Sequence, residues 1–78
     1  MSIDPAELDA VQTHYKSAVE DWIRAIREEE TLATPAVHSE ANIDQWEAAA
    51  RNEEEARDRA KAAKAHYEQA LRKEFFNL

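Results

Sequence analysis

The strongest constraint in this sequence is the near absence of residues that turn a chain. Glycine is missing from all 78 residues, and the two prolines are Pro5 and Pro35. Because glycine and proline mark most turns in proteins, this composition predicts very few of them. Pro35 places one break near the middle of the chain, since the residue before a proline is pushed out of helical geometry. The sequence therefore predicts two long helices joined by one turn.

The first expected helix covers residues 5–32. Asp4, Pro5 and Glu7 are typical of a helix start, with a capping side chain, a proline at the first helical position and an acid three residues after the cap. Large apolar residues then recur three or four positions apart, which is the spacing of a helix and not of a strand. They are Leu8, Val11, Tyr15, Val19, Trp22, Ile23 and Ile26.

The second expected helix covers residues 42–76, after a turn at 33–41. Asn42 and Gln45 match a capping box at its start, and Ser39 is a competing cap. From Glu47 to His66 the only apolar residue type is alanine, which has the highest helix propensity. Four alanines recur at intervals of seven and so share one side of a helix: Ala49, Ala56, Ala63 and Ala70.

These features predict an all-α fold, with residues 1–78 forming one domain that is an antiparallel two-helix hairpin with close alanine-mediated packing. A turn centred near residues 37–38 would place Ile26 opposite Ala49 and Leu8 opposite Tyr67. Large side chains of the first helix would then face small ones of the second. The expected hairpin-packing residues are Leu8, Val11, Tyr15, Val19, Ile26, Ala49, Ala56, Ala60, Ala63, Tyr67 and Ala70. Glu53 lies in line with this stripe, either at its edge or as a buried polar residue that fixes the register.

A two-helix hairpin cannot enclose a core, so some large apolar residues should stay uncovered and form an interface. The candidates for a dimer or partner interface are Trp22, Ile23, Trp46, Leu71, Phe75, Phe76 and Leu78. We expect a homodimer, most simply a four-helix bundle of two hairpins, and an unknown protein partner is a further option. Residues 1–55 contain 4 basic and 14 acidic residues, whereas residues 56–78 contain 6 and 3. An antiparallel dimer would set the acidic part against the basic part.

The sequence contains none of the common signatures of catalysis or cofactor binding. There is no cysteine for a disulfide, a thiolate metal site or a nucleophile, and no glycine-rich loop for a phosphate. His14, His38 and His66 lack the Glu-x-x-His spacing of metal-binding bundles, and the acidic runs lack the spacing of a calcium loop. We therefore expect no catalytic residue, no metal, no cofactor and no enzymatic activity.

The overall charge restricts the partners. A net charge of −7 disfavours nucleic acids and anionic membranes, and no window approaches the roughly 18 apolar residues of a membrane span. The first residues lack the basic and apolar regions of a signal peptide, which predicts a cytoplasmic protein and leaves leaderless secretion open.

No specific function can be read from these residues. The expected class is a small, acidic, self-associating helical protein that acts as a protein–protein interaction or assembly module. One alternative is a small enzyme or ligand-binding bundle formed at the dimer interface. Another is a secreted ESAT-6-like helical hairpin. That idea rests on topology alone, because the Trp-x-Gly turn of those proteins is missing and Trp46 is followed by Glu47 and Ala48.

Overall fold

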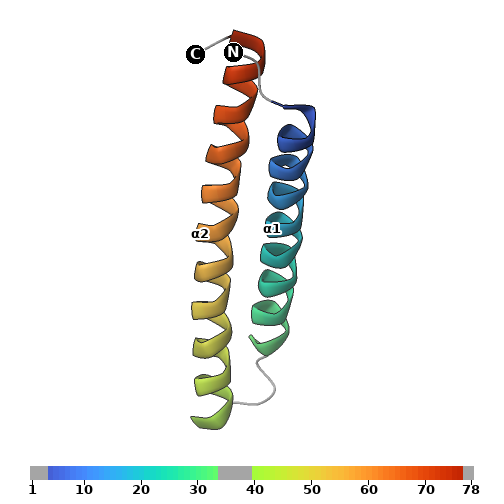
Figure 1. The fold of residues 1–78 in the computed structure, drawn as a ribbon. Coiled ribbons are helices and arrows are strands. Elements are labelled where there is room, and N and C mark those ends of the chain that lie inside the picture. The colour runs from blue at the N-terminus through green and yellow to red at the C-terminus, as the bar shows by residue number, and fades with distance from the viewer. Residues whose placement is uncertain (1–3, 34–39, 77–78) are drawn as a thin grey trace.

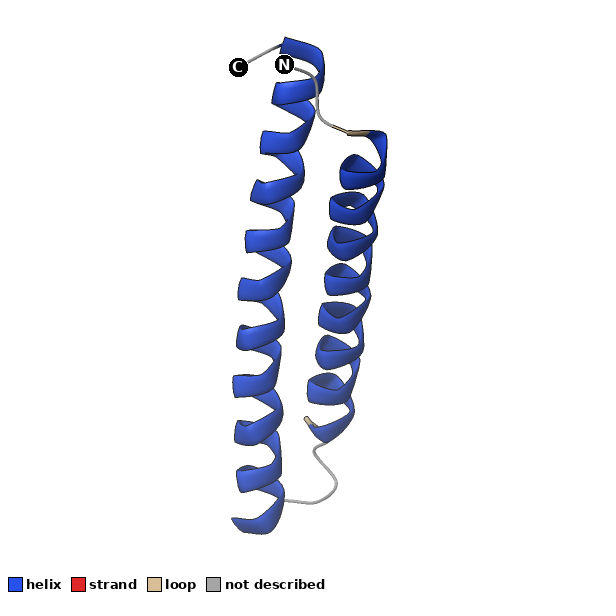
Figure 2. Cartoon of the chain, viewed as in Figure 1, coloured by secondary structure: helices blue, strands red, loops and turns tan. Residues whose placement is uncertain are grey.

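A computed structural model describes residues 4–33 and 40–76, and within these ranges the protein is helical without strands. Helix α1 spans Pro5–Leu32 and helix α2 spans Glu40–Phe76. The two helices pack side by side in opposite directions (Figure 1), and Figure 2 shows helix along both arms. The prediction of an all-α protein with two helices packed against each other is confirmed. The Cα atoms span 57 × 16 × 13 Å, so the molecule is a thin rod.

The start of α1 is fixed by the predicted cap. The Asp4 side chain accepts a hydrogen bond from the Ala6 backbone N–H at 3.0 Å, and Pro5 occupies the first helical position. The Leu8 N–H donates to the Asp4 carbonyl at 3.0 Å and closes the first turn. This side chain therefore satisfies one of the backbone N–H groups that a helix start leaves unpaired.

The connection between the helices differs from the expected one. The last turn of α1 is closed by the Ala33 N–H, which donates to two carbonyls of the preceding turn. Helix α2 begins at Glu40, so Asn42 lies inside the helix and the prediction of Asn42 as its cap is wrong. The acidic side chain of Glu40 suits a helix start, because the N-terminal end of a helix carries partial positive charge. The competing cap Ser39 and the break at Thr34–Pro35 lie outside the described residues.

Among the described residues, every buried side chain is an alanine. The seven residues are Ala18 and Ala25 of α1 and Ala49, Ala56, Ala60, Ala63 and Ala70 of α2. We call this set the alanine seam. We expected bulky residues of α1 to face these α2 alanines, but α1 contributes alanines of its own, again seven apart. Methyl groups on both sides allow the helix axes to approach toward the short end of the usual ~8–10 Å, so larger side chains are displaced to the flanks. Tyr15, Val19 and Trp22 pack against the seam in this way.

The register of the hairpin is displaced by one to two helical turns from the expected one, since Ala18, expected level with residue 57, packs with Ala60 and Ala63. Tyr67, which we expected opposite Leu8, stacks on Tyr15 with ring centroids 5.7 Å apart. At the other end, Leu32 lines the same groove as Gln45. The expected register assumed that the turn divides the two helices symmetrically. Instead, the start of α2 extends past the end of α1 at the tip of the hairpin, where the chain turns (Figure 1).

Candidate interaction face

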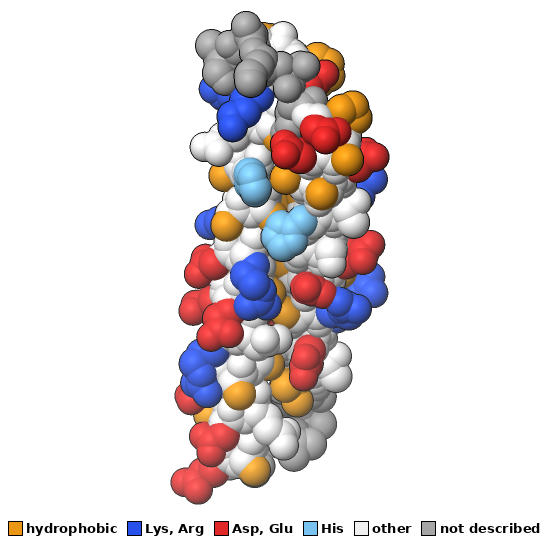
Figure 3. All heavy atoms as spheres, viewed as in Figure 1, with side chains coloured by type: hydrophobic (Ala, Val, Ile, Leu, Met, Phe, Trp, Pro, Cys, Tyr) orange, Lys and Arg blue, Asp and Glu red, His pale blue; other side chains and the backbone are white. Residues whose placement is uncertain are grey.

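The two sides of the alanine seam differ in character. On one side a groove between the helices is lined by the polar side chains of His14, Ser17 and Asp21 of α1 and of Arg59 and His66 of α2, together with three alanines. The exposed side chains of Asp21 and Arg24 form an ion pair beside it. Figure 3 shows charged side chains of both signs on either flank of a narrow line of hydrophobic ones. This polar side presents few large apolar groups to a partner.

On the opposite side of the seam, two contacts join the helices, and their residues define this side. The Trp22 indole N–H donates a hydrogen bond to Glu53, and Tyr15 stacks on Tyr67. Residues three, four or seven positions from these four lie on the same side of their helices. We call this side the apolar face. Its large apolar members are Leu8, Tyr15, Val19, Trp22 and Ile26 of α1, and Trp46, Tyr67 and Leu71 of α2. One further step away from the seam adds Ile23, Ile43 and Phe75 at its outer edge.

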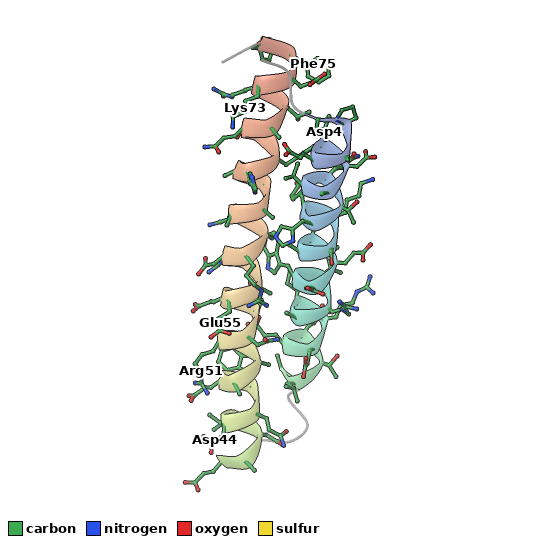
Figure 4. The ribbon with its side chains drawn as sticks, in the orientation of Figure 1. Asp4, Asp44, Arg51, Glu55, Lys73 and Phe75 are labelled. Atoms are coloured by element: carbon green, nitrogen blue, oxygen red, sulfur yellow. The ribbon has the colours of Figure 1, made fainter. Side chains whose placement is uncertain are left out.

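Several large side chains of the apolar face are open to solvent. Ile26, Ile43, Trp46 and Phe75 are between 39% and 70% exposed. Figure 4 shows Phe75 at the open end of the hairpin, near the first turn of α1 at Asp4. Fully burying a side chain of this size is worth about 1.5–3 kcal/mol. A partner that covered the face would gain this free energy at several positions.

The structure places the candidate interface residues at different depths. Trp46, Leu71 and Phe75 lie on the apolar face, with Leu71 half-buried. Trp22 is half-buried against the seam, so part of its indole ring is already used within the hairpin. Leu78 lies outside the described residues.

The last two candidates lie at and beyond the outer edge of this face. Ile23 is exposed at the edge, because it lies four positions from Val19 and three from Ile26. Phe76 is exposed too, but it follows Phe75 and is rotated by about 100° from it, beyond the edge of the face. The sequence identified them as large and apolar, but the register of the hairpin decides which residues share a side.

The residues expected to pack inside the hairpin also divide into groups. Ala49, Ala56, Ala60, Ala63 and Ala70 are buried in the seam. Half-buried beside it are Leu8, Val11, Tyr15, Val19 and Tyr67. Ile26 differs from the expectation, because it is 40% exposed on the apolar face. Ala25, one residue earlier, occupies the helix contact at 3% exposure and turns Ile26 outward.

Three residues that matter here are absent from the predicted packing and interface sets. Ala18 and Ala25 are the α1 half of the seam, and Ile43 is the most exposed isoleucine of the apolar face. The seven-residue spacing that identified the α2 alanines also relates Ala18 to Ala25. It was masked by the large apolar residues around them.

A small polar cluster lies near the middle of the apolar face. The Trp22 Nε1–H donates to Glu53 Oε2 at 2.8 Å, and Glu53 is half-buried at the edge of the seam. One turn further along α2, the Nε atom of half-buried Arg57 is buried and has no hydrogen-bond partner among the described residues. We call Trp22, Glu53 and Arg57 the polar centre. A buried donor without an acceptor carries a free-energy cost, so this part of the surface is not fully satisfied within one hairpin.

The described histidines and acidic residues form no metal site. His14 and His66 lie on the polar groove, and His38 is outside the described residues. Across residues 4–33 and 40–76 no group of three or more His, Asp or Glu side chains is arranged to hold a metal ion. Within the same ranges, neither helix has the length and apolar character needed to cross a membrane.

Comparisons with protein-family models, with curated proteins and with solved structures find no match to this chain. The apolar face and its polar centre therefore carry the functional argument by themselves.

Proposed function

We propose that this protein is a self-associating helical hairpin that acts as a protein–protein interaction or assembly module. Its apolar face would be buried against a second copy, giving a dimeric four-helix bundle. The observation that supports this is the contrast between core and surface. The described residues bury only alanines, whereas Ile26, Ile43, Trp46 and Phe75 are 39–70% exposed.

Burial of the apolar face would contribute more free energy than burial of the alanine seam. A buried methyl group contributes on the order of 0.8 kcal/mol, so the alanine seam is a weak core for two helices of this length. Helices in proteins obtain most of their stability from the packing of an apolar face, and here that face lies on the outside. A second copy offers a face of the same length and character. Two-fold pairing of identical patches is the commonest form of protein oligomer.

Sedimentation velocity at micromolar concentration tests the proposal directly. The expected species has twice the 9.0 kDa mass of the chain. Ile26→Glu should weaken association, because it places a carboxylate in the middle of the apolar face. Ala65→Glu is the matched control. It adds the same charge at an exposed position, and Ala65 lies about 200° around the helix from buried Ala63.

Sedimentation of the wild type and of the two variants can give three distinguishable outcomes. A wild-type chain that is folded and monomeric at these concentrations would refute self-association. If Ile26→Glu and Ala65→Glu lower the mass equally, the apolar face is not the interface. A dimer weakened only by Ile26→Glu supports the proposal.

A further inference from the structure

The net charge of this hairpin is concentrated at one end. The tip comprises residues 25–32 and 40–55 and contains 9 acidic and 2 basic residues, which gives −7. The remaining described part, residues 4–24 and 56–76, contains 8 of each and is neutral. Because the register sets these segments side by side, the charge difference runs along the long axis of the rod. Two copies packed with their tips together would place both charges of −7 at the same end.

The polar centre lies close to the midpoint of the rod. Helix α2 runs from Glu40 to Phe76, so residue 58 is its middle, directly after Arg57. When two antiparallel copies overlap along nearly their full length, the two polar centres therefore lie next to each other. The Glu53 carboxylate uses one oxygen for the Trp22 indole and has capacity for further hydrogen bonds.

We infer that the second copy lies antiparallel on the apolar face, with the Arg57 guanidinium donating to the Glu53 carboxylate of the other copy. This inference rests on the proposed self-association and specifies its geometry. A two-fold axis across the rod near residue 57, one residue from the middle of α2, sets α2 against α2 of the second copy in opposite directions. Each acidic tip then meets the neutral part of the other hairpin, where α2 is basic. The opposing Glu53 lies level with residue 61, four residues or about one helical turn from Arg57, which an arginine side chain spans.

The chain has no cysteine, so a single introduced cysteine reports the orientation. Asp44→Cys is suitable because Asp44 lies on the outer side of α2 near the tip, away from α1 (Figure 4). A spin label there lies 13 residues from residue 57. In the antiparallel dimer the two labels are separated by roughly 39 Å along the axis, at 1.5 Å per residue. In a parallel dimer they lie at the same level, separated by the bundle width of roughly 20–25 Å.

A charge exchange tests the proposed pair of side chains. Arg57→Glu places two carboxylates at each polar centre, and Glu53→Arg places two guanidinium groups there. Each variant alone should self-associate at least tenfold more weakly than the wild type. An equimolar mixture should associate, because the two centres are then of opposite charge. The mixture also controls for folding, since unfolded variants would not recover association when mixed.

The results distinguish this inference from the proposal beneath it. A dimer with the long label distance, in which the two variants associate only when mixed, supports the antiparallel arrangement and the Arg57–Glu53 pair. A dimer with the short distance overturns the antiparallel arrangement and leaves self-association intact. A dimer with the long distance whose variants each associate like the wild type overturns the pair. A wild-type monomer overturns self-association itself.

Discussion

Ala63→Leu is the most direct test of how closely the two helices pack. Ala63 is 3% exposed and forms one cluster with Ala18 and Ala60 at the centre of the seam. Leucine adds three carbon atoms at a point where alanine methyl groups from both helices already meet. The helices must then separate, or the new side chain must leave its preferred rotamer.

The expected loss of unfolding free energy follows from the size of the added side chain. Overpacking a tight contact by a few methylene groups costs about 1–3 kcal/mol of unfolding free energy. Alanine and leucine both have high helix propensities, so the change in propensity is a minor part of this cost. For a chain of this length, each kcal/mol lowers Tm by roughly 4–8 °C.

The assay is urea and thermal unfolding followed by far-ultraviolet circular dichroism. Ala65→Leu is the control, because Ala65 is exposed and undergoes the same substitution two residues away. All samples are compared at one protein concentration, since self-association would add to the apparent stability. The stronger variant Ala63→Glu should cost more than Ala63→Leu, because it also removes a carboxylate from water.

The comparison of these two variants also defines the result that would refute tight packing at Ala63. If Ala63→Leu and Ala65→Leu differ by less than about 0.5 kcal/mol, Ala63 behaves like a surface position. A stabilising effect of Ala63→Leu would show an unfilled space between the helices. Either result would contradict tight packing at the seam, which is our explanation for the exposure of the large apolar residues.

Two further predictions concern the ends of the rod. Asp4→Ala should lower the unfolding free energy by about 0.5–2 kcal/mol through loss of the α1 cap, whereas Asp4→Asn and the exposed-site control Asp9→Ala should change it little; equal effects of all three in urea unfolding would exclude the capping role. Phe75→Ser should weaken dimerisation about tenfold, because burying a phenylalanine is worth 1.5–3 kcal/mol and 1.4 kcal/mol corresponds to a factor of ten. Phe76→Ser removes an equally exposed ring that points off the apolar face, so a similar weakening in sedimentation would contradict the assignment of that face.

The parts of this fold that could be predicted depend on local residue chemistry. The absence of glycine and the cap at Asp4 are properties of short segments, and they identify two helices and the start of the first. The seven-residue spacing of the α2 alanines is a property of one helix, and all four are buried. Each of these patterns lies within one helix, so it can be recognised without knowing how the other helix packs against it.

The register could not be predicted in the same way, because it depends on how the two helices compete for one contact. Tyr67 was expected opposite Leu8, yet stacking on Tyr15 uses two aromatic rings at once. The hydrogen bond from Trp22 to Glu53 joins two residues that the expected register also places opposite each other, because long side chains reach across such a displacement. A symmetric turn does not predict the tyrosine pair, and a displacement of one to two turns changes which residues face each other.

The seam and the apolar face are two consequences of one choice of residues. A hairpin that packed its tyrosines, tryptophans and isoleucines between its helices would bury them internally and leave a polar exterior. Here alanines occupy the line between the axes, at seven-residue spacing on both helices, and leave no room there for larger groups. The large residues are displaced to one side, where the polar centre interrupts an otherwise apolar surface. Tight packing within one hairpin thus produces the surface that we propose for association, so stability and self-association should depend on the same alanines.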